Sequence, residues 1–151
     1  MQRIIISDAS CLILLEKIGE LELLNKLFGT IITTPEVATE FGLPLPKWIE
    51  IQEVVNKKYQ SIIEASVDKG EASAIALAIE SLDCLIIIDD KKAQKFAQQL
   101  NLNVTGTVGI IVDAKHSGII PAVEPLLVKI KNTNFRISEK LKMIILKKAG
   151  E

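Results

Sequence analysis

Four acidic residues lie far apart in the chain but at comparable places in its predicted elements: Asp8, Glu40, Glu71 and Asp90. Each falls where a predicted strand ends or a predicted helix begins. Hard divalent ions such as Mg²⁺ or Mn²⁺ are held by several carboxylate oxygens. Because the carboxyl ends of parallel strands meet at one edge of a sheet, such residues can converge there. The pattern therefore predicts a divalent-metal site.

Each acid also has an ordinary structural explanation. Asp8, and either Asp89 or Asp90, could cap the helices that follow them. Glu71 could favour the first turn of its helix through the helix dipole, and Glu40 could face solvent. Ala9 and Ser10 are small, so we expect them to leave the Asp8 carboxylate accessible. The metal-site hypothesis rests on the joint pattern of the four acids.

The elements that must position these acids alternate between strand and helix. Hydrophobic runs predict strands at 4–7, 30–33, 85–88 and 102–105, and residues 48–55 form a weaker extended segment that serves as a connection. Apolar spacing and capping residues predict helices at 11–18, 21–28, 35–41, 59–67, 71–80, 91–100, 106–114, 122–130 and 138–148. This order predicts a single three-layer α/β/α domain over residues 1–151, with a mostly parallel central sheet and a C-terminal helical tail at 120–151.

Composition agrees with one folded domain, since 48% of the 151 residues are hydrophobic. The apolar runs 11–15 and 84–88 are far shorter than the about 20 residues of a membrane helix. The first residues lack the apolar stretch of a secretory signal, so we expect a cytoplasmic protein. Cys11 and Cys84 stand in apolar segments without a metal-binding spacing, and we expect buried, reduced thiols.

The charge pattern limits the classes of partner. With a formal net charge of −1, the chain has no global basic field, so any polyanion must be held locally. Lys91, Lys92 and Lys95 beside Asp90 could do so, or could form a solvated helix face. His116 is the only histidine, which argues against a catalytic triad, and no glycine-rich nucleotide-binding motif is present.

Five segments in chain order resemble those of a PIN domain, the metal-dependent ribonuclease fold of VapC toxins: IIISDASCLI, TPEVATEF, GEASAIALA, LIIIDDKKAQKFA and VTGTVGIIVDA. The closing segment, FRISEKLKMIILKKAGE, resembles the tail of a less-studied VapC-like branch. Together these segments cover nearly the whole chain.

The resemblance implies roles for individual residues. Asp8 would be the central metal ligand, with Glu71, Asp90 and Asp89 completing the cluster and Glu40 acting through water or as a base. Ser10 and Thr107 would support the pocket, and Lys91 and Lys92 would bind substrate. The third acid is more usually aspartate, and the fourth motif more usually begins with Thr or Ser, where this chain has Ile88.

The function that the resemblance implies is Mg²⁺- or Mn²⁺-dependent hydrolysis of RNA by the toxin of a toxin–antitoxin pair. It also implies a homodimer and a small antitoxin partner; the apolar residues of 12–28 could form that dimer interface or belong to the core. A catalytically inactive PIN-like module that binds RNA or a protein is the alternative. A receiver-like signalling domain is a third reading, weakened because no aspartate ends the strand at 30–33.

Overall fold

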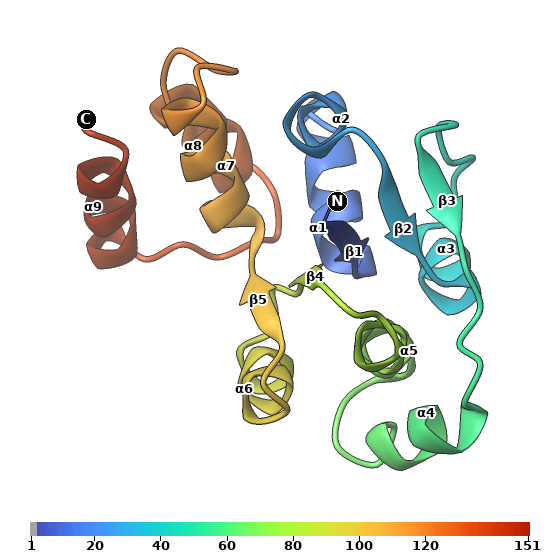
Figure 1. Cartoon of the computed structure of the whole chain (residues 1–151). Coiled ribbons are helices and arrows are strands. Elements are labelled where there is room, and N and C mark those ends of the chain that lie inside the picture. Colours follow the sequence, from blue (N-terminus) through green and yellow to red (C-terminus); the bar gives the residue numbers. More distant parts are fainter. Residues whose placement is uncertain (1–2) are drawn as a thin grey trace.

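The computed structural model describes residues 3–151 and contains a five-stranded, all-parallel sheet in the order β3-β2-β1-β4-β5 (Figure 1). The strands are β1 (Ile4–Ser7), β2 (Ile31–Thr33), β3 (Ile49–Ile51), β4 (Cys84–Ile87) and β5 (Asn103–Thr105). β1 lies at the centre, paired with β2 on one side and β4 on the other. β1, which Asp8 follows, therefore has a neighbouring strand on each side.

Helices cover both faces of this sheet. One core includes α1 (Ala9–Lys17), α2 (Glu22–Phe28), α3 (Pro35–Phe41), α7 (Thr107–His116), α8 (Glu124–Lys131) and α9 (Glu139–Lys148). The other includes α4 (Lys57–Ile63), α5 (Lys69–Glu80) and α6 (Lys91–Gln99). The prediction of a three-layer α/β/α fold is confirmed.

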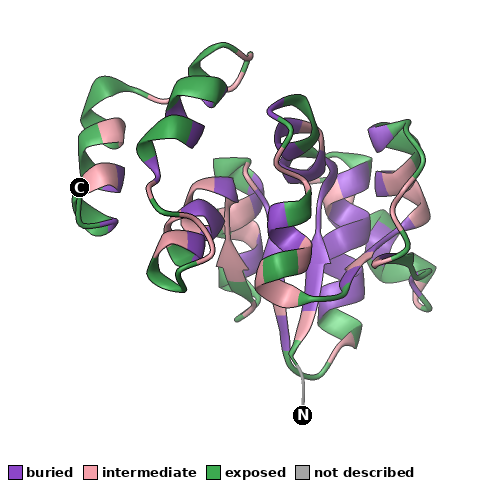
Figure 2. Cartoon of the chain, turned by 90° about the horizontal axis from the view of Figure 1, so that it is seen from above, coloured by how far each residue is buried: buried purple, intermediate pink, exposed green. Residues whose placement is uncertain are grey.

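Successive residues of the short strands pack alternately into these two cores. In β1, Ile5 packs into the first core and Ile6 into the second; in β4, Ile87 and Ile86 do the same. Because both faces are buried, the strands consist of almost continuous aliphatic residues, as is usual in parallel sheets. Figure 2 shows the buried residues concentrated in the sheet and the helices against it, whereas the tail helices near the C-terminus are largely exposed.

Most element boundaries follow the predictions, with two exceptions. Residues 48–55, expected only as an extended connection, contain the short strand β3, which pairs with β2. The other exception is α4. This helix runs from Lys57 to Ile63, where the apolar pattern predicts 59–67. Asn56 begins it by accepting a hydrogen bond from the Tyr59 backbone. The chain must then turn before Asp68, whose side chain caps α5, so the helix ends early.

The apolar residues of 12–28 belong mainly to the core of this chain. Leu12, Leu15 and Leu24 are fully buried in the first core. Cys11 and Cys84 are buried and free, as expected. Among residues 3–151, no helix combines the length and the apolar character needed to cross a bilayer.

Candidate active site

Asp8 is the most buried acid of the predicted set. It follows β1, its backbone N–H donates to the Ile87 carbonyl (3.0 Å), and its Oδ1 accepts from the Cys11 backbone (3.2 Å). Only 1% of its surface is exposed, so the expected accessible carboxylate is wrong. Asp8 does cap α1, but Oδ2 is buried without a hydrogen-bond partner. An ionised carboxylate in this position is costly unless a cation or a proton compensates it.

Burial raises the pKa of Asp8 well above its usual value, and the charge of Asp89 raises it further. Glu71 adds a smaller effect of the same sign. Like charges at close range resist joint ionisation. The fold therefore brings Asp89 and Glu71 within electrostatic range of Asp8, although both are far from it in sequence.

Asp89 is held by the first residue of α7. Its Oδ1 accepts from the Thr107 backbone N–H (2.7 Å) and its Oδ2 accepts from the Thr107 hydroxyl (2.6 Å). Burial raises the pKa of Asp89, and these two hydrogen bonds counteract part of that rise. Thr107 is itself fully buried. Thr107 therefore holds the Asp89 carboxylate in a fixed position.

Gly106, the N-cap of α7, lies directly against this arrangement. A Cβ at this position would come within 2.9 Å of Asp89 Oδ1 and 3.2 Å of Gln94 Nε2. Neither group is free to retreat, because Asp89 is bonded twice to Thr107 and Gln94 donates to the Ile88 carbonyl (2.6 Å).

We expect Gly106→Ala to displace Asp89 and to lower an activity that depends on this carboxylate by about 10- to 100-fold, because small displacements of an active-site group have large kinetic costs. The matched variant is Gly70→Ala, whose Cβ would meet the Glu40 side chain at 2.7 Å. Glu40 is exposed and can swing aside, so we expect Gly70→Ala to fold normally, and its rate reports how far the position of Glu40 matters. Steady-state rates and thermal melting curves are measured for both variants. Wild-type activity in Gly106→Ala would mean that the position of Asp89 does not matter.

Glu71 stands in the first turn of α5 and forms a capping box with Asp68. The Glu71 backbone donates to Asp68 Oδ1 (2.8 Å), and the Asp68 backbone donates to Glu71 Oε1 (3.4 Å). Burial raises the pKa of Glu71 to about 7, and the charges of Asp68 and Asp90 contribute to that rise. Glu71 can therefore exchange a proton near neutral pH.

Asp90 has the capping role that the sequence left open. Its Oδ2 accepts from the Ala93 backbone (2.9 Å) at the start of α6, and the residue is exposed. Asp90 also lines a hollow of about 400 Å³ together with Asp68, Glu71 and Lys92. It is thus placed beside Glu71, whereas Asp89 is the acid placed beside Asp8.

Glu40 and Ser10 are exposed and do not line the hollow that Glu71 and Asp90 share. Glu40 is exposed on α3 and lines a separate hollow of about 500 Å³ with Lys57, Lys69 and Gly70. Burial and then the charge of Asp68 raise its pKa. Ser10 is exposed on α1.

Buried hydroxyl groups that the sequence did not single out stabilise the same edge of the sheet. Ser7 donates to the Asp8 carbonyl (3.0 Å), and Thr33 donates to the Ser7 carbonyl (3.0 Å). Thr34 and Ser73 share a hydrogen bond of 2.6 Å that joins α3 to α5. The Asp68-x-x-Glu71 spacing was a visible capping signal for Asp68; nothing local marks Thr34 and Ser73 as a pair.

The acidic groups fit a hard divalent cation in their chemistry. Within residues 3–151, no three His, Cys, Asp or Glu side chains converge closely enough to form a metal site as they stand. The unpartnered, buried Oδ2 of Asp8 and the neighbouring carboxylates nevertheless supply the all-oxygen donors that Mg²⁺ and Mn²⁺ prefer.

Comparison with protein families identifies the family to which the chain belongs. The PIN-domain family model matches residues 4–151, so the chain belongs to the PIN-domain family. Members of this family are in general nucleases, typically with divalent metals, and their substrates are nucleic acids. No curated protein and no solved structure shows significant similarity to this chain. The resemblance drawn from the sequence is confirmed at the level of the family.

Proposed function

We propose that this protein is a Mg²⁺- or Mn²⁺-dependent endoribonuclease that hydrolyses RNA phosphodiester bonds. The observation that carries the proposal is the buried Asp8 carboxylate, which has one unpartnered oxygen and lies beside the charges of Asp89 and Glu71. Membership of the PIN-domain family supports hydrolysis of nucleic acid in general. The uncompensated negative charge supports the dependence on a cation.

Asp8, Asp89 and Glu71 would hold the ion, with Asp90 beside Glu71. When bound, a divalent ion lowers the pKa of a water molecule and stabilises negative charge on the phosphate. Thr107 holds Asp89 in place through its two hydrogen bonds, which counteract part of the rise in its pKa caused by burial. Glu71, whose pKa is about 7, can accept a proton at neutral pH. Glu40 remains a proposed base or water-mediated ligand.

Lys91 and Lys92 are proposed to bind the phosphate backbone. Both are exposed in the first turn of α6, directly after Asp90, and Lys92 lines the hollow with Glu71. Phosphate is also favoured near a helix N-terminus.

We expect Lys91→Gln/Lys92→Gln to raise KM about 3- to 10-fold and to leave kcat unchanged, because surface cations add mainly binding energy. Lys17→Gln/Lys26→Gln is the matched control, since it removes the same charge from α1 and α2. Initial rates over a range of RNA concentrations measure both parameters. An equal rise in KM for the control would assign the effect to net charge instead of position.

The nuclease proposal is tested by incubating purified protein with a mixed RNA pool and Mn²⁺, with EDTA as the control. Attack by water leaves a phosphate monoester on one product end and a hydroxyl on the other, without a 2′,3′-cyclic phosphate. We expect cutting that EDTA stops and products that lack the cyclic phosphate. Cutting that continues in EDTA, or cyclic products, would contradict the proposal.

A non-catalytic PIN-like module that binds RNA or a protein is the second candidate. It is favoured by the capping role of Asp90 and by the position of Glu40, which lines a different hollow from Glu71 and Asp90. Metal-independent RNA binding together with no Mn²⁺ binding would support the module. Binding of Mn²⁺ that depends on Asp8 would support the enzyme.

A toxin role, a homodimer and a small antitoxin partner are proposed from the VapC-like resemblance alone. Induced expression in a bacterial host should arrest growth for wild-type protein but not for Asp8→Asn. Sedimentation analysis of the purified protein tests the dimer. Growth that is unaffected by the wild-type protein would argue for an RNA-processing role without toxicity.

A further inference from the structure

Positive charge is concentrated in the C-terminal tail. Residues 120–151 contain seven Lys or Arg against three Asp or Glu, whereas residues 1–119 contain 11 against 16. The near-zero net charge of the whole chain therefore conceals an acidic body and a basic tail. Such an asymmetry between parts of one chain is typical of contact with a polyanion.

Few of these charges are neutralised within the molecule. Among residues 3–151, Lys129 pairs with Glu20 (3.2 Å). The other cations of the tail make no ion pair there: Lys131, Arg136, Lys140, Lys142, Lys147 and Lys148. Glu151 is engaged elsewhere, since its carboxylate accepts from the Val123 and Glu124 backbones and pairs with Lys115 (3.2 Å).

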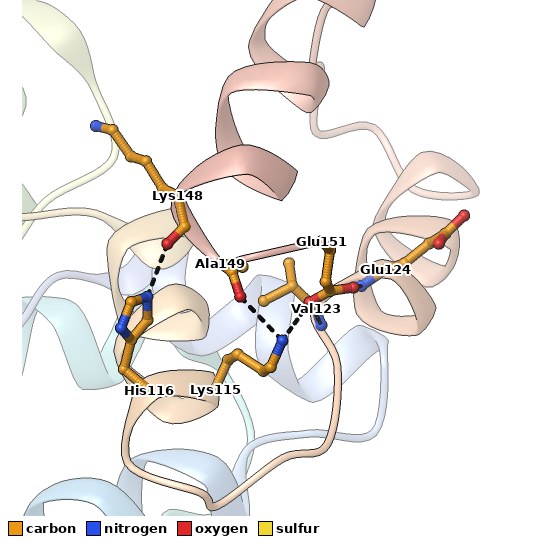
Figure 3. Close-up of polar contacts among 7 residues, drawn as sticks. All are labelled: Lys115, His116, Val123, Glu124, Lys148, Ala149 and Glu151. Carbon is orange, nitrogen blue, oxygen red and sulfur yellow. Dashed lines mark hydrogen bonds and ion pairs between the residues drawn. The ribbon is translucent and has the colours of Figure 1, made fainter.

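These contacts fix the tail to the helix that starts at the acidic site. Lys115 Nζ donates to the Ala149 carbonyl (2.9 Å), and His116 Nε2 lies 2.8 Å from the Lys148 carbonyl (Figure 3). Both residues end α7, whose first residue is Thr107. A ten-residue helix is about 15 Å long. The basic tail is therefore held at a set distance from Asp89.

A hollow of about 410 Å³ lies between α8 and α9, and we call it the tail hollow. Its lining includes three cations, Lys131, Arg136 and Lys142, against one carboxylate, Glu139, together with Phe135 and other apolar side chains. Phe135 packs partly against the core, so its ring is held in position. An aromatic ring among cations is the combination that binds single-stranded nucleic acid, through base stacking and phosphate contacts.

We propose that the tail hollow binds single-stranded RNA, with an unstacked base against Phe135 and neighbouring phosphates on Lys131, Arg136 and Lys142. This inference rests on the proposed ribonuclease function. It names the form of the substrate, unpaired RNA, and a binding place for it outside the acidic site, in the tail hollow. The tail then retains the strand while the acidic edge of the sheet acts on another part of it.

The test is binding of a fluorescent single-stranded RNA, followed by anisotropy in EDTA so that no cleavage is required. We expect Lys131→Gln/Arg136→Gln/Lys142→Gln to weaken binding at least about tenfold, and the slope of log affinity against log salt to become about 2 units shallower. The control Lys17→Gln/Lys26→Gln/Lys58→Gln removes equal charge and should change affinity less than twofold. Phe135→Leu, checked for folding by circular dichroism, should weaken binding about tenfold.

Four results would overturn the proposal. One is equal weakening in the tail triple variant and its control. A second is an unchanged affinity in Phe135→Leu, which would exclude base stacking on this ring. A third is displacement of RNA by polyglutamate as readily as by unlabelled RNA, which would assign the surface to an acidic protein. The fourth is no RNA binding by the wild type. Since the assay contains EDTA, failure of cleavage alone would affect only the nuclease proposal.

Discussion

Replacing Asp8 by asparagine is expected to reduce Mn²⁺-dependent RNA cleavage by about 10³-fold or more, equivalent to about 4 kcal/mol of transition-state stabilisation. Asparagine keeps the size of the side chain, and its carbonyl oxygen can still accept from the Cys11 backbone. What it removes is the negative charge on the buried Oδ2. Cleavage rates at saturating Mn²⁺ measure the effect.

Asp113→Asn is the matched control for this change. Asp113 is exposed on α7, away from the acidic edge, and the substitution removes the same charge. We expect its cleavage rate to stay within twofold of wild type. If Asp8→Asn retained more than a tenth of wild-type activity while folded, Asp8 would not be the centre of the site.

The metal-free protein is expected to lose stability as the pH rises. The folded protein binds protons more tightly than the unfolded chain at Glu71, Asp8 and Asp89, because burial raises all three pKa values. The free energy of unfolding therefore falls as the pH rises above the unfolded values, which are about 4. For Glu71 the fall is complete only above its folded pKa of about 7. Because this side chain is half exposed and solvent screens it, we expect its share to be about 1 kcal/mol.

Although Asp8→Asn is expected to lower activity, we expect it to raise the stability of the metal-free protein. At pH 8 and without metal, we expect Asp8→Asn to be more stable than wild type by about 1 kcal/mol, because one buried unpaired charge is gone. Near pH 4 the difference should vanish, since Asp8 is then protonated. Denaturant unfolding at both pH values, with Asp113→Asn alongside, measures this. A wild-type protein more stable at pH 8 than at pH 5 in EDTA would refute the linkage.

Much of the fold followed from local signals in the sequence. The aliphatic strand before Asp8 and the helix over 35–41 form as predicted, and the helix predicted at 138–148 begins one residue later, after the Ser138 cap. These features depend on neighbouring residues, and hydrophobic pattern and capping chemistry describe them well. Asp8, Glu71 and Asp90 also lie at a strand end or a helix start as predicted, whereas Glu40 lies in the last turn of α3.

The grouping of the acids could not be predicted in the same way. Asp89 and Asp90 both follow β4, and the sequence does not say which of them faces Asp8. Their positions are set by hydrogen bonds. Thr107, 18 residues later in the chain, donates two hydrogen bonds to Asp89, and the Ala93 backbone N–H donates to Asp90. The burial of Asp8 likewise depends on packing between distant elements. Such choices belong to tertiary structure and leave no local signal.

The most direct test of the metal centre is calorimetric titration of Mn²⁺ into metal-free wild-type protein, Asp8→Asn and Asp113→Asn at pH 8. We predict binding to the wild type and to Asp113→Asn, with loss of binding in Asp8→Asn. Mn²⁺ binding to Asp8→Asn with the stoichiometry and affinity of the wild type would contradict a metal centre built around Asp8.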